Sequence, residues 1–212
     1  MKNPATRFKV QASSNRMFLT PRAFTLIETM IAVTILTFAV AGPLFTASRV
    51  VVAAQTARSQ LTASYLAQEG IEYVRLMRDN EYISAYRVGG SDVSSVAWMN
   101  FLNGENRSSI TACRATECTF DPTRDMGSGS GFSLQPCSGN SCGPLYLASG
   151  IYTQRSDIVG SVRTPFTRTI QVVDIPGTVD EYPDKRAISK VSWSFHGTPY
   201  SVTITEHLTP WQ

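Results

Sequence analysis

Apolar residues gather in one long run near the start of the chain. The run extends from Ala23 to Ala47 and contains a single charged side chain, Glu28. Because an α-helix rises about 1.5 Å per residue, roughly 20 residues cross the hydrocarbon core of a bilayer. The run therefore predicts one membrane-spanning helix over residues 24–47. A carboxylate deep in lipid costs about 2.5–3.5 kcal/mol, so Glu28 marks a candidate functional position.

A two-sided pattern follows the apolar run. Apolar or small residues recur at steps of three and four, with polar residues opposite them, which is typical of an amphipathic helix. The first face carries Ala63, Leu66, Ala67, Gly70, Ile71, Val74 and Met77, and the second carries Gln68, Glu69, Glu72 and Arg75. The periodicity fails near Asn80. An amphipathic continuation of the helix is therefore predicted over residues 48–80, with one face against a domain.

The rest of the chain, residues 81–212, is expected to form that globular domain. Its first element is a short helix that Ser91-Asp92 can cap and that Asn103-Gly104 ends. Residues 104–144 show no regular period and include the sequence Gly-Ser-Gly-Ser-Gly at 127–131. They predict a long loop region.

Strand patterns dominate residues 145–208. Val191–Phe195 and Tyr200–Thr205 alternate apolar and small polar side chains, and residues 196–199 between them favour a turn, which predicts an antiparallel hairpin. The other strand candidates are residues 145–147, 151–153 and 169–173. An antiparallel sheet with one apolar face would cover the apolar stripe of the helix. The sequence thus predicts an α+β fold in which a long N-terminal helix packs on a C-terminal antiparallel β-sheet.

The residue order at the start of the apolar run resembles a known processing signal. Residues 23–33, Ala-Phe-Thr-Leu-Ile-Glu-Thr-Met-Ile-Ala-Val, are similar to the processing segment of the type IV pilin superfamily of major pilins, minor pilins and pseudopilins. In that family an inner-membrane prepilin peptidase cuts before a Phe and methylates the new amino terminus. The resemblance implies cleavage between Ala23 and Phe24, N-methylation of Phe24 and an assembly role for Glu28. Ala23 departs from the usual glycine but is also small, so processing is still expected.

The resemblance also implies how the subunit assembles. A buried ammonium at Phe24 and a buried carboxylate at Glu28 each need a partner, and in the family model they pair between neighbouring subunits. Gly42 and Pro43 are expected to bend or loosen the helix, because proline lacks an amide hydrogen and crowds the preceding turn. The implied partners are prepilin peptidase, other pilin subunits, the inner-membrane assembly platform and, before assembly, membrane lipid.

Residues 1–23, the leader that the implied cleavage would remove, differ in charge from the remainder of the chain. Residues 1–23 contain five cations and no acid, and such a segment stays on the cytoplasmic side while the rest is sent outward. The cations are Lys2, Arg7, Lys9, Arg16 and Arg22. Their removal takes a formal charge of +3 to −2, so the basic pI belongs to the leader. Nucleic acid is therefore not an expected partner.

Two simpler interpretations of the apolar run stay open. Ala39-Val40-Ala41 matches the small-x-small pattern of a signal-peptidase site, which would make the run a secretory signal peptide. Three features count against a signal peptide: the acid Glu28 within the apolar run, the long leader, and the apolar residues that continue beyond the supposed cut. A plain single-pass anchor is the second alternative, and it leaves the Phe-Thr-Leu-Ile-Glu order unexplained.

Four cysteines form two pairs, each with four residues between its members: Cys113 with Cys118, and Cys137 with Cys142. Paired cysteines of an exported domain normally become disulfides, and local pairing is favoured, with the crossed connectivities left open. Short disulfide loops gain little chain-entropy stabilisation, so their expected role is to brace a loop. Tetrahedral zinc, which usually needs tighter spacing, is the less favoured alternative.

The remaining motifs lack the context that their chemistry needs. Gly139–Gly143 fits the Gly-x-Ser-x-Gly elbow of serine hydrolases, but it lies between two cysteines without the strand and helix of that motif. His196 and His207 are the only histidines, and no pattern places either beside Ser141. The acids Asp174, Asp180, Glu181 and Asp184 lack the spacing of a calcium loop. No enzymatic activity, metal or cofactor is expected.

Three function classes remain. A structural subunit of a type IV pilus or related filament is favoured, and the disulfide-braced loops with a sizeable domain favour a minor pilin. A pseudopilin of a type II secretion or DNA-uptake system is the runner-up. A membrane-anchored binding domain would need an exposed aromatic or basic patch, and residues 104–144 hold only Arg107, Arg114 and Arg124. The expected location is the cytoplasmic membrane, spanned once with the C-terminal domain outside, and then a surface filament.

Overall fold

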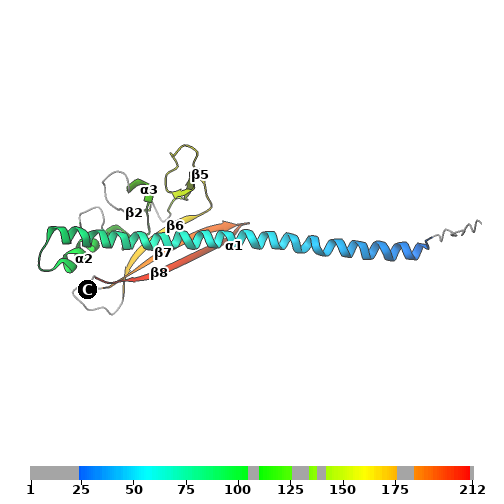
Figure 1. Ribbon diagram of the computed structural model, residues 1–212, viewed down its shortest axis with the longest axis horizontal. Helices are drawn as coiled ribbons and strands as arrows, with labels where there is room; N and C mark the ends of the chain where they lie inside the picture. The colour runs from blue at the N-terminus through cyan, green and yellow to red at the C-terminus, as the bar shows by residue number, and fades with distance from the viewer. Residues whose placement is uncertain (1–23, 105–109, 126–133, 138–141, 176–183, 211–212) are drawn as a thin grey trace, which may run out of the picture. The chain divides into compact units, whose positions relative to one another are not determined.

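The computed structural model describes most of the chain, and the described segments are residues 24–104, 110–125, 134–137, 142–175 and 184–210 (Figure 1). The chain divides into two compact units, residues 1–51 and residues 52–212. The helix α1 (Leu26–Val88) contributes its first part to the first unit and its remainder to the second. In the second unit α1 packs with antiparallel sheets, so the fold is α+β as predicted.

The amphipathic part of α1 is longer than predicted. The helix does not stop near Asn80 but continues to Val88, and Gly89, with φ 78°, follows it and donates its amide to the Ala85 carbonyl. A glycine in this left-handed conformation is a common helix terminator. The sequence reading ended too early because the next position of the buried stripe after Met77 is an acid, Glu81.

The short helix α2 (Val93–Asn103) confirms the prediction at both ends. The Asp92 carboxylate accepts a hydrogen bond from the Ser95 amide at 3.3 Å, and the Gly104 amide donates to the Asn100 carbonyl at 2.8 Å. The apolar face of α2 is buried against the core, where Trp98 and Phe101 are almost completely covered.

The main sheet has five strands in the order β2-β1-β6-β7-β8, and every neighbouring pair is antiparallel. Its strands are β1 (Cys118–Thr119), β2 (Gln135–Pro136), β6 (Thr167–Asp174), β7 (Lys185–Phe195) and β8 (Thr198–Leu208). The predicted hairpin is confirmed as β7 and β8. Its turn is the pair His196-Gly197, with φ of 49° and 80°, as in two-residue hairpin turns that need positive φ at both central positions.

A smaller sheet contains the other predicted strand pair. β3 (Tyr146–Ala148) pairs antiparallel with β4 (Ile151–Thr153) and, on its other side, with β5 (Val162–Arg163). The predicted pairing is confirmed, but these strands form a sheet of their own with the order β4-β3-β5.

The region predicted as one long loop, residues 104–144, contains short elements. They are η1 (Thr111–Cys113), β1, α3 (Pro122–Asp125) and β2. β1 joins the main sheet through the pairing of Cys118 with Ile170 on β6. A strand of two residues has no alternation to detect, which explains why the sequence pattern missed it.

The core of the second unit lies between α1 and the main sheet. The buried face of α1 is the predicted stripe, and alternate residues of β6 and β7 pack against it. Gly70 lies at the closest approach, because a Cβ built on it would be 2.3 Å from Ser189 Oγ and 3.4 Å from Ile170 Cδ1. Only a residue without a side chain lets the helix come so near β7.

We expect Gly70→Ala to lower the free energy of unfolding by about 1–2 kcal/mol, because overpacking outweighs the better helix propensity of alanine. Urea unfolding of the full chain in detergent, followed by fluorescence of the buried Trp98 and Trp193, measures this change. Gly42→Ala is the matched control in the same helix, since nothing lies within 4 Å of its added Cβ. Equal effects of the two substitutions would contradict the packing argument.

Among the described residues of the second unit, two cations are buried, which the sequence pattern did not predict. Arg168 on β6 has no exposed side-chain surface, and its guanidinium donates to the Glu69 carboxylate of α1 and to the Phe120 carbonyl. The guanidinium also lies 3.7 Å from the Phe120 ring centroid. Glu69 was predicted on the solvated face of α1, but it is half-buried because it pairs with Arg168. Burial lowers the pKa of Arg168 and Glu69 opposes that shift.

Lys185 at the start of β7 is the second buried cation, and its ammonium donates to Asp174 Oδ1 at 2.6 Å. This hydrogen bond, with the charges of Lys185 and Arg114, holds the pKa of Asp174 below its usual value of 3.8. A carboxyl with a lowered pKa stabilises the fold above its usual pKa, and the contribution is lost as the pH falls through the folded-state pKa.

Asp174→Asn should therefore flatten the decline of stability with pH below about pH 4 while leaving the profile above pH 5 parallel to that of the unmodified chain. Urea midpoints measured from about pH 6 to pH 2 give the two profiles. Because most of the Asp174 side chain is exposed, the difference is expected to be small and to shrink with added salt. Profiles that stay parallel below pH 4 would exclude this role for Asp174.

Candidate functional site

Glu28 lies in the first turn of α1, and a cap fixes this turn. The Glu28 amide donates to the carbonyl of Thr25 at 3.0 Å and to its Oγ1 at 3.3 Å. A threonine in this position satisfies a helix amide that has no intrahelical acceptor. Glu28 thereby lies in the first turn, where the positive end of the helix dipole stabilises a carboxylate.

Phe24 and Glu28 both face outward at this end of the helix. Phe24 is 76 % exposed, and Glu28 is exposed as well. Within the described part of the chain, the Glu28 carboxylate forms no hydrogen bond or ion pair. Ala23 lies outside the described residues. The structure therefore presents an acid one turn from Phe24 whose charge is not balanced by any described neighbour.

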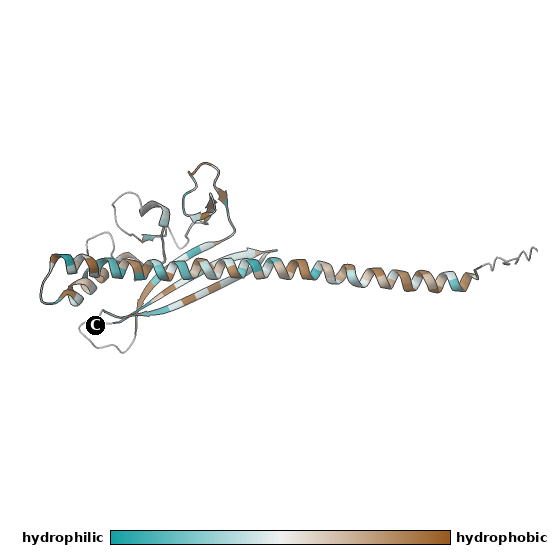
Figure 2. Ribbon diagram, viewed as in Figure 1, coloured by the Kyte–Doolittle hydropathy of each residue, from teal (hydrophilic) through white to brown (hydrophobic). Residues whose placement is uncertain are grey.

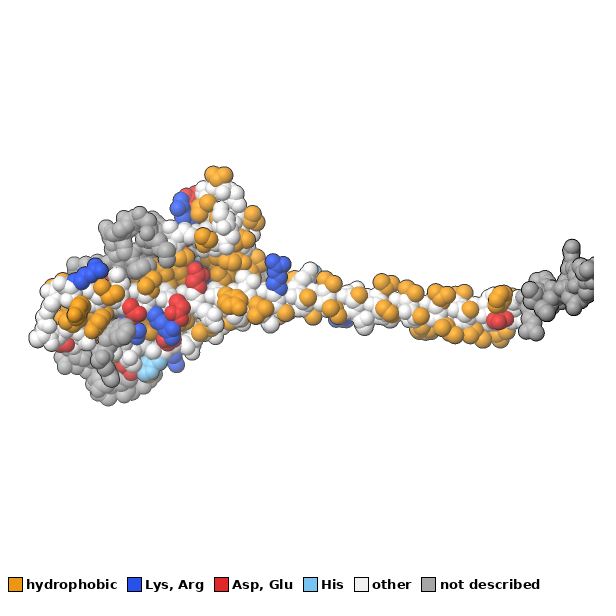
Figure 3. Space-filling view, viewed as in Figure 1, with side chains coloured by type: hydrophobic (Ala, Val, Ile, Leu, Met, Phe, Trp, Pro, Cys, Tyr) orange, Lys and Arg blue, Asp and Glu red, His pale blue; other side chains and the backbone are white. Residues whose placement is uncertain are grey.

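The apolar part of α1 has no packing partner within the described chain. Every residue from 24 to 51 is exposed, and among the described residues α1 is the one helix long and apolar enough to cross a membrane (Figure 2). The space-filling view shows hydrophobic side chains along this part of the helix (Figure 3). Burial of one large apolar side chain gains about 1.5–3 kcal/mol, so this surface favours an apolar environment from outside the chain.

The hydroxyl groups within the apolar segment are satisfied by the helix itself. The Oγ1 atoms of Thr29, Thr34 and Thr37 each donate to the carbonyl three residues earlier, at 2.8 Å. Thr46 donates to the Pro43 carbonyl at 2.9 Å. Because these donors already have partners, the segment can enter a medium without water and leave none of these four hydroxyls unpaired.

One face of the segment is suited to close helix contact. Val33, Leu36, Thr37, Val40, Ala41 and Leu44 line a shallow hollow that is almost entirely apolar. Small residues such as Thr37 and Ala41 let a second helix approach closely in lipid. The residues that line the hollow recur at steps of three and four, so the hollow lies along a single side of the helix.

The helix is unbroken at Gly42 and Pro43. Pro43 has no amide hydrogen to donate to the Ala39 carbonyl, so one backbone hydrogen bond of the helix is missing there. The bend or loosening expected at this pair remains a prediction.

The cysteines form the local pairs, Cys113–Cys118 and Cys137–Cys142. The first disulfide joins η1 to β1 and is buried in the core. In the part of the chain that the structure describes, no group of three or more His, Cys, Asp or Glu side chains could hold a metal ion.

The other motifs lie partly within and partly outside the described residues. Ser141 of the Gly-x-Ser-x-Gly sequence lies outside the described residues, as do the glycine-rich segment 127–131, Asp180 and Glu181. His196 lies in the β7–β8 turn, and His207 pairs with Asp184 at 2.9 Å. Asp174 and Asp184 therefore each contact a basic side chain of their own domain.

Thr25 is the residue of this site that the sequence reasoning missed. The signal was present, because Thr25-x-x-Glu28 has the Ser/Thr-x-x-Glu spacing of a capping box before an apolar run.

Comparison with known proteins identifies this same segment. Residues 21–42 match the family model described as the prokaryotic N-terminal methylation motif. Among the curated proteins and among the solved structures, no match to the chain was found. The matched range includes Ala23, Phe24 and Glu28, and the motif implies processing by prepilin peptidase and assembly with other pilin subunits. The N-terminal segment of this chain therefore carries the type IV pilin signature.

Proposed function

We propose that the chain is a structural subunit, specifically a minor pilin, of a type IV pilus or related filament. Prepilin peptidase removes residues 1–23 and methylates the amino group of Phe24. The observation that supports this most is the fully exposed apolar part of α1, which begins at the methylation motif and has no described partner in its own chain.

The amino group of Phe24 and the carboxylate of Glu28 set the axial register between neighbouring subunits. After cleavage, Phe24 carries the only new positive charge at this end, and Glu28 lies one helical turn away. In the dry centre of a filament neither charge is tolerable alone, so the amine of one subunit pairs with Glu28 of its neighbour. Apolar burial along residues 24–47 supplies most of the association. Head-to-tail contacts that do not close into a ring produce a helical filament.

Before assembly the same helix holds the subunit in the cytoplasmic membrane. The chain spans the bilayer once, with the cationic leader inside and the C-terminal domain outside. An inner-membrane platform then moves the subunit from lipid into the growing filament. The intrahelical hydrogen bonds of the threonine hydroxyls let the helix occupy both environments without unpaired donors.

The globular unit favours a minor pilin over a major one. Its two disulfides brace the segments between α2 and β3, and the first of them is buried in the core. Such a unit adds a distinct surface to a filament without carrying catalytic groups. A pseudopilin would share the processing and assembly steps, and the identity of the surrounding filament system separates the two roles.

Processing tests the proposal directly. Coexpression with prepilin peptidase is expected to shorten the chain by the 23-residue leader and to deliver it to the sheared filament fraction. Ala23→Leu should block both, because the position before the cut must be small, whereas the control Ala23→Gly should be processed at least as fast as the natural chain. Filament incorporation of the uncleaved Ala23→Leu chain would exclude the proposed role of processing.

A further inference from the structure

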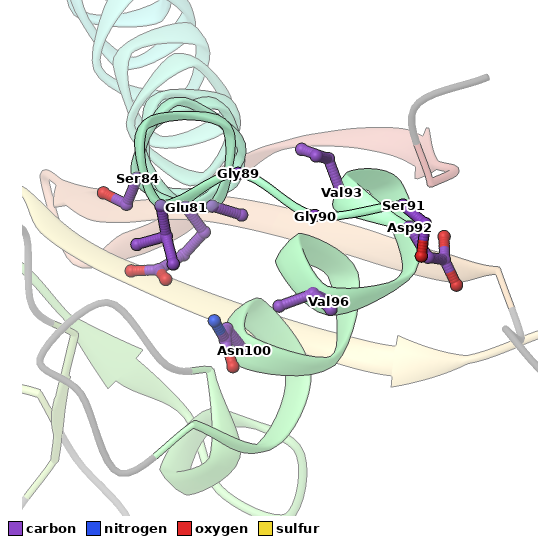
Figure 4. A pocket seen from close by; sticks show the side chains of 11 residues that line it. Glu81, Ser84, Gly89, Gly90, Ser91, Asp92, Val93, Val96 and Asn100 are labelled. Carbon is purple, nitrogen blue, oxygen red and sulfur yellow. The ribbon is translucent and has the colours of Figure 1, made fainter.

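A hollow of about 490 Å³ lies between the last turns of α1 and the helix α2 (Figure 4). Its volume is within the range of small-ligand sites. Ala85 and Val88 of α1 and Val93 and Val96 of α2 form apolar walls, and the Gly89-Gly90 connection closes one side. None of the residues that line it is basic.

Glu81 is the unusual residue of this hollow. It is 5 % exposed and continues the core-facing stripe of α1. Within the described part of the chain it makes no hydrogen bond or ion pair. Figure 4 shows the side chains of Glu81 and Asn100 on the same side of the hollow, whereas Asp92 points away from α1. Glu81 lines the hollow and has little other contact with solvent, so a cation or a donor in the hollow would stabilise its carboxylate.

The surroundings of Glu81 favour a positive ligand. The hollow adjoins the C-terminus of α1, where the helix dipole and the last carbonyls attract cations. Asp92 does not complete the site, because it caps α2 through the Ser95 amide. Calcium requires six to eight oxygen ligands, and no cluster of three acidic or metal-ligating side chains exists in the described segments. An organic cation fits better, since apolar walls lie beside Glu81 and the other carboxylate of the lining, Asp92, already accepts the Ser95 amide.

We propose that this hollow binds an alkyl chain that ends in an ammonium or guanidinium group. The cation pairs with the Glu81 carboxylate, and the alkyl part contacts Val88, Val93 and Val96. A lysine or arginine side chain of another protein carries this chemistry, and so does a free diamine. The site is separate from the processing segment and does not depend on the proposed filament role.

The test uses the full chain in detergent micelles with labelled valine methyl groups. Titration with Nα-acetyl-lysine N-methylamide or with cadaverine should shift the Val88, Val93 and Val96 signals in a saturable way. The neutral analogue Nα-acetyl-norleucine N-methylamide should bind at least tenfold more weakly, because it lacks the charged hydrogen bond. Binding of cadaverine alone would assign the site to free amines, and binding of the lysine analogue to side chains.

Variants distinguish Glu81 from general surface charge. Glu81→Gln should weaken binding of the cation about tenfold or more, whereas the control Glu72→Gln, on an exposed part of the same helix, should leave it unchanged. The urea midpoint of Glu81→Gln without ligand should equal or exceed that of the natural chain, which shows that lost binding is not lost folding. Equal binding by the natural chain and Glu81→Gln, or no saturable shift with either amine, would overturn the proposal.

Discussion

Glu28→Ala is expected to leave leader cleavage intact and to remove the subunit from sheared filaments. Cleavage depends on the residues at the Ala23–Phe24 bond, whereas assembly places the Phe24 amine in a medium without water. An uncompensated buried charge costs about 3–5 kcal/mol, which corresponds to a loss of incorporation of at least about a hundredfold. Quantitative blotting of membrane and sheared fractions measures both steps.

Two control variants make this result specific to charge. Glu28→Gln keeps the size and helical position of the side chain and should fail nearly as badly as alanine. Thr34→Ala removes a hydroxyl that donates to the Ile31 carbonyl of its own helix, and it should assemble normally. Normal incorporation of both Glu28 variants would show that the amine finds another partner.

Glu69→Ala is expected to cause the largest loss of stability in the second unit. It leaves the buried Arg168 guanidinium with the Phe120 carbonyl and ring but without a carboxylate. Removal of one partner of a buried pair costs about 3–5 kcal/mol, and the partial exposure of Glu69 places the expected loss near 3 kcal/mol, because water can reach the vacated position. Urea unfolding of the full chain in detergent gives the value.

The companion variants test whether the cost arises from an unpaired charge. Arg168→Met removes the cation but retains volume, so it should cost less than Glu69→Ala. The double variant should be more stable than Glu69→Ala alone, because no buried charge remains without its partner. Additive losses would indicate that Glu69 and Arg168 act independently, and the interpretation of this contact as an ion pair would then be wrong.

Periodic features of the fold could be predicted, whereas paired charges could not. The stripe through Ala63, Gly70 and Met77 and the alternation around Trp193 depend on local spacing, so the long helix and the β7–β8 hairpin follow from the sequence. Burial of Arg168 depends on Glu69 and Phe120, which are distant in the chain, so no local period indicates it. The two-residue strand β1 likewise exists because Cys118 meets Ile170 on β6.

The candidate site was predictable for a different reason. The order from Phe24 to Glu28 is part of the matched methylation motif, a short local sequence, so its recognition needs no tertiary contact. The Thr25 cap is equally local and could have been predicted from its spacing to Glu28. By contrast, Glu81 only interrupts the apolar stripe in the sequence, and no local pattern indicates that it is buried beside α2.

Mass spectrometry of the amino terminus of the membrane-extracted protein shows whether the leader is removed before Phe24. We expect a chain that begins at N-methylated Phe24, with the same terminus in the filament fraction. A chain that still begins at Met1 in the surface form would contradict it, and a chain that begins at Gly42 would instead identify an exported protein released by signal peptidase.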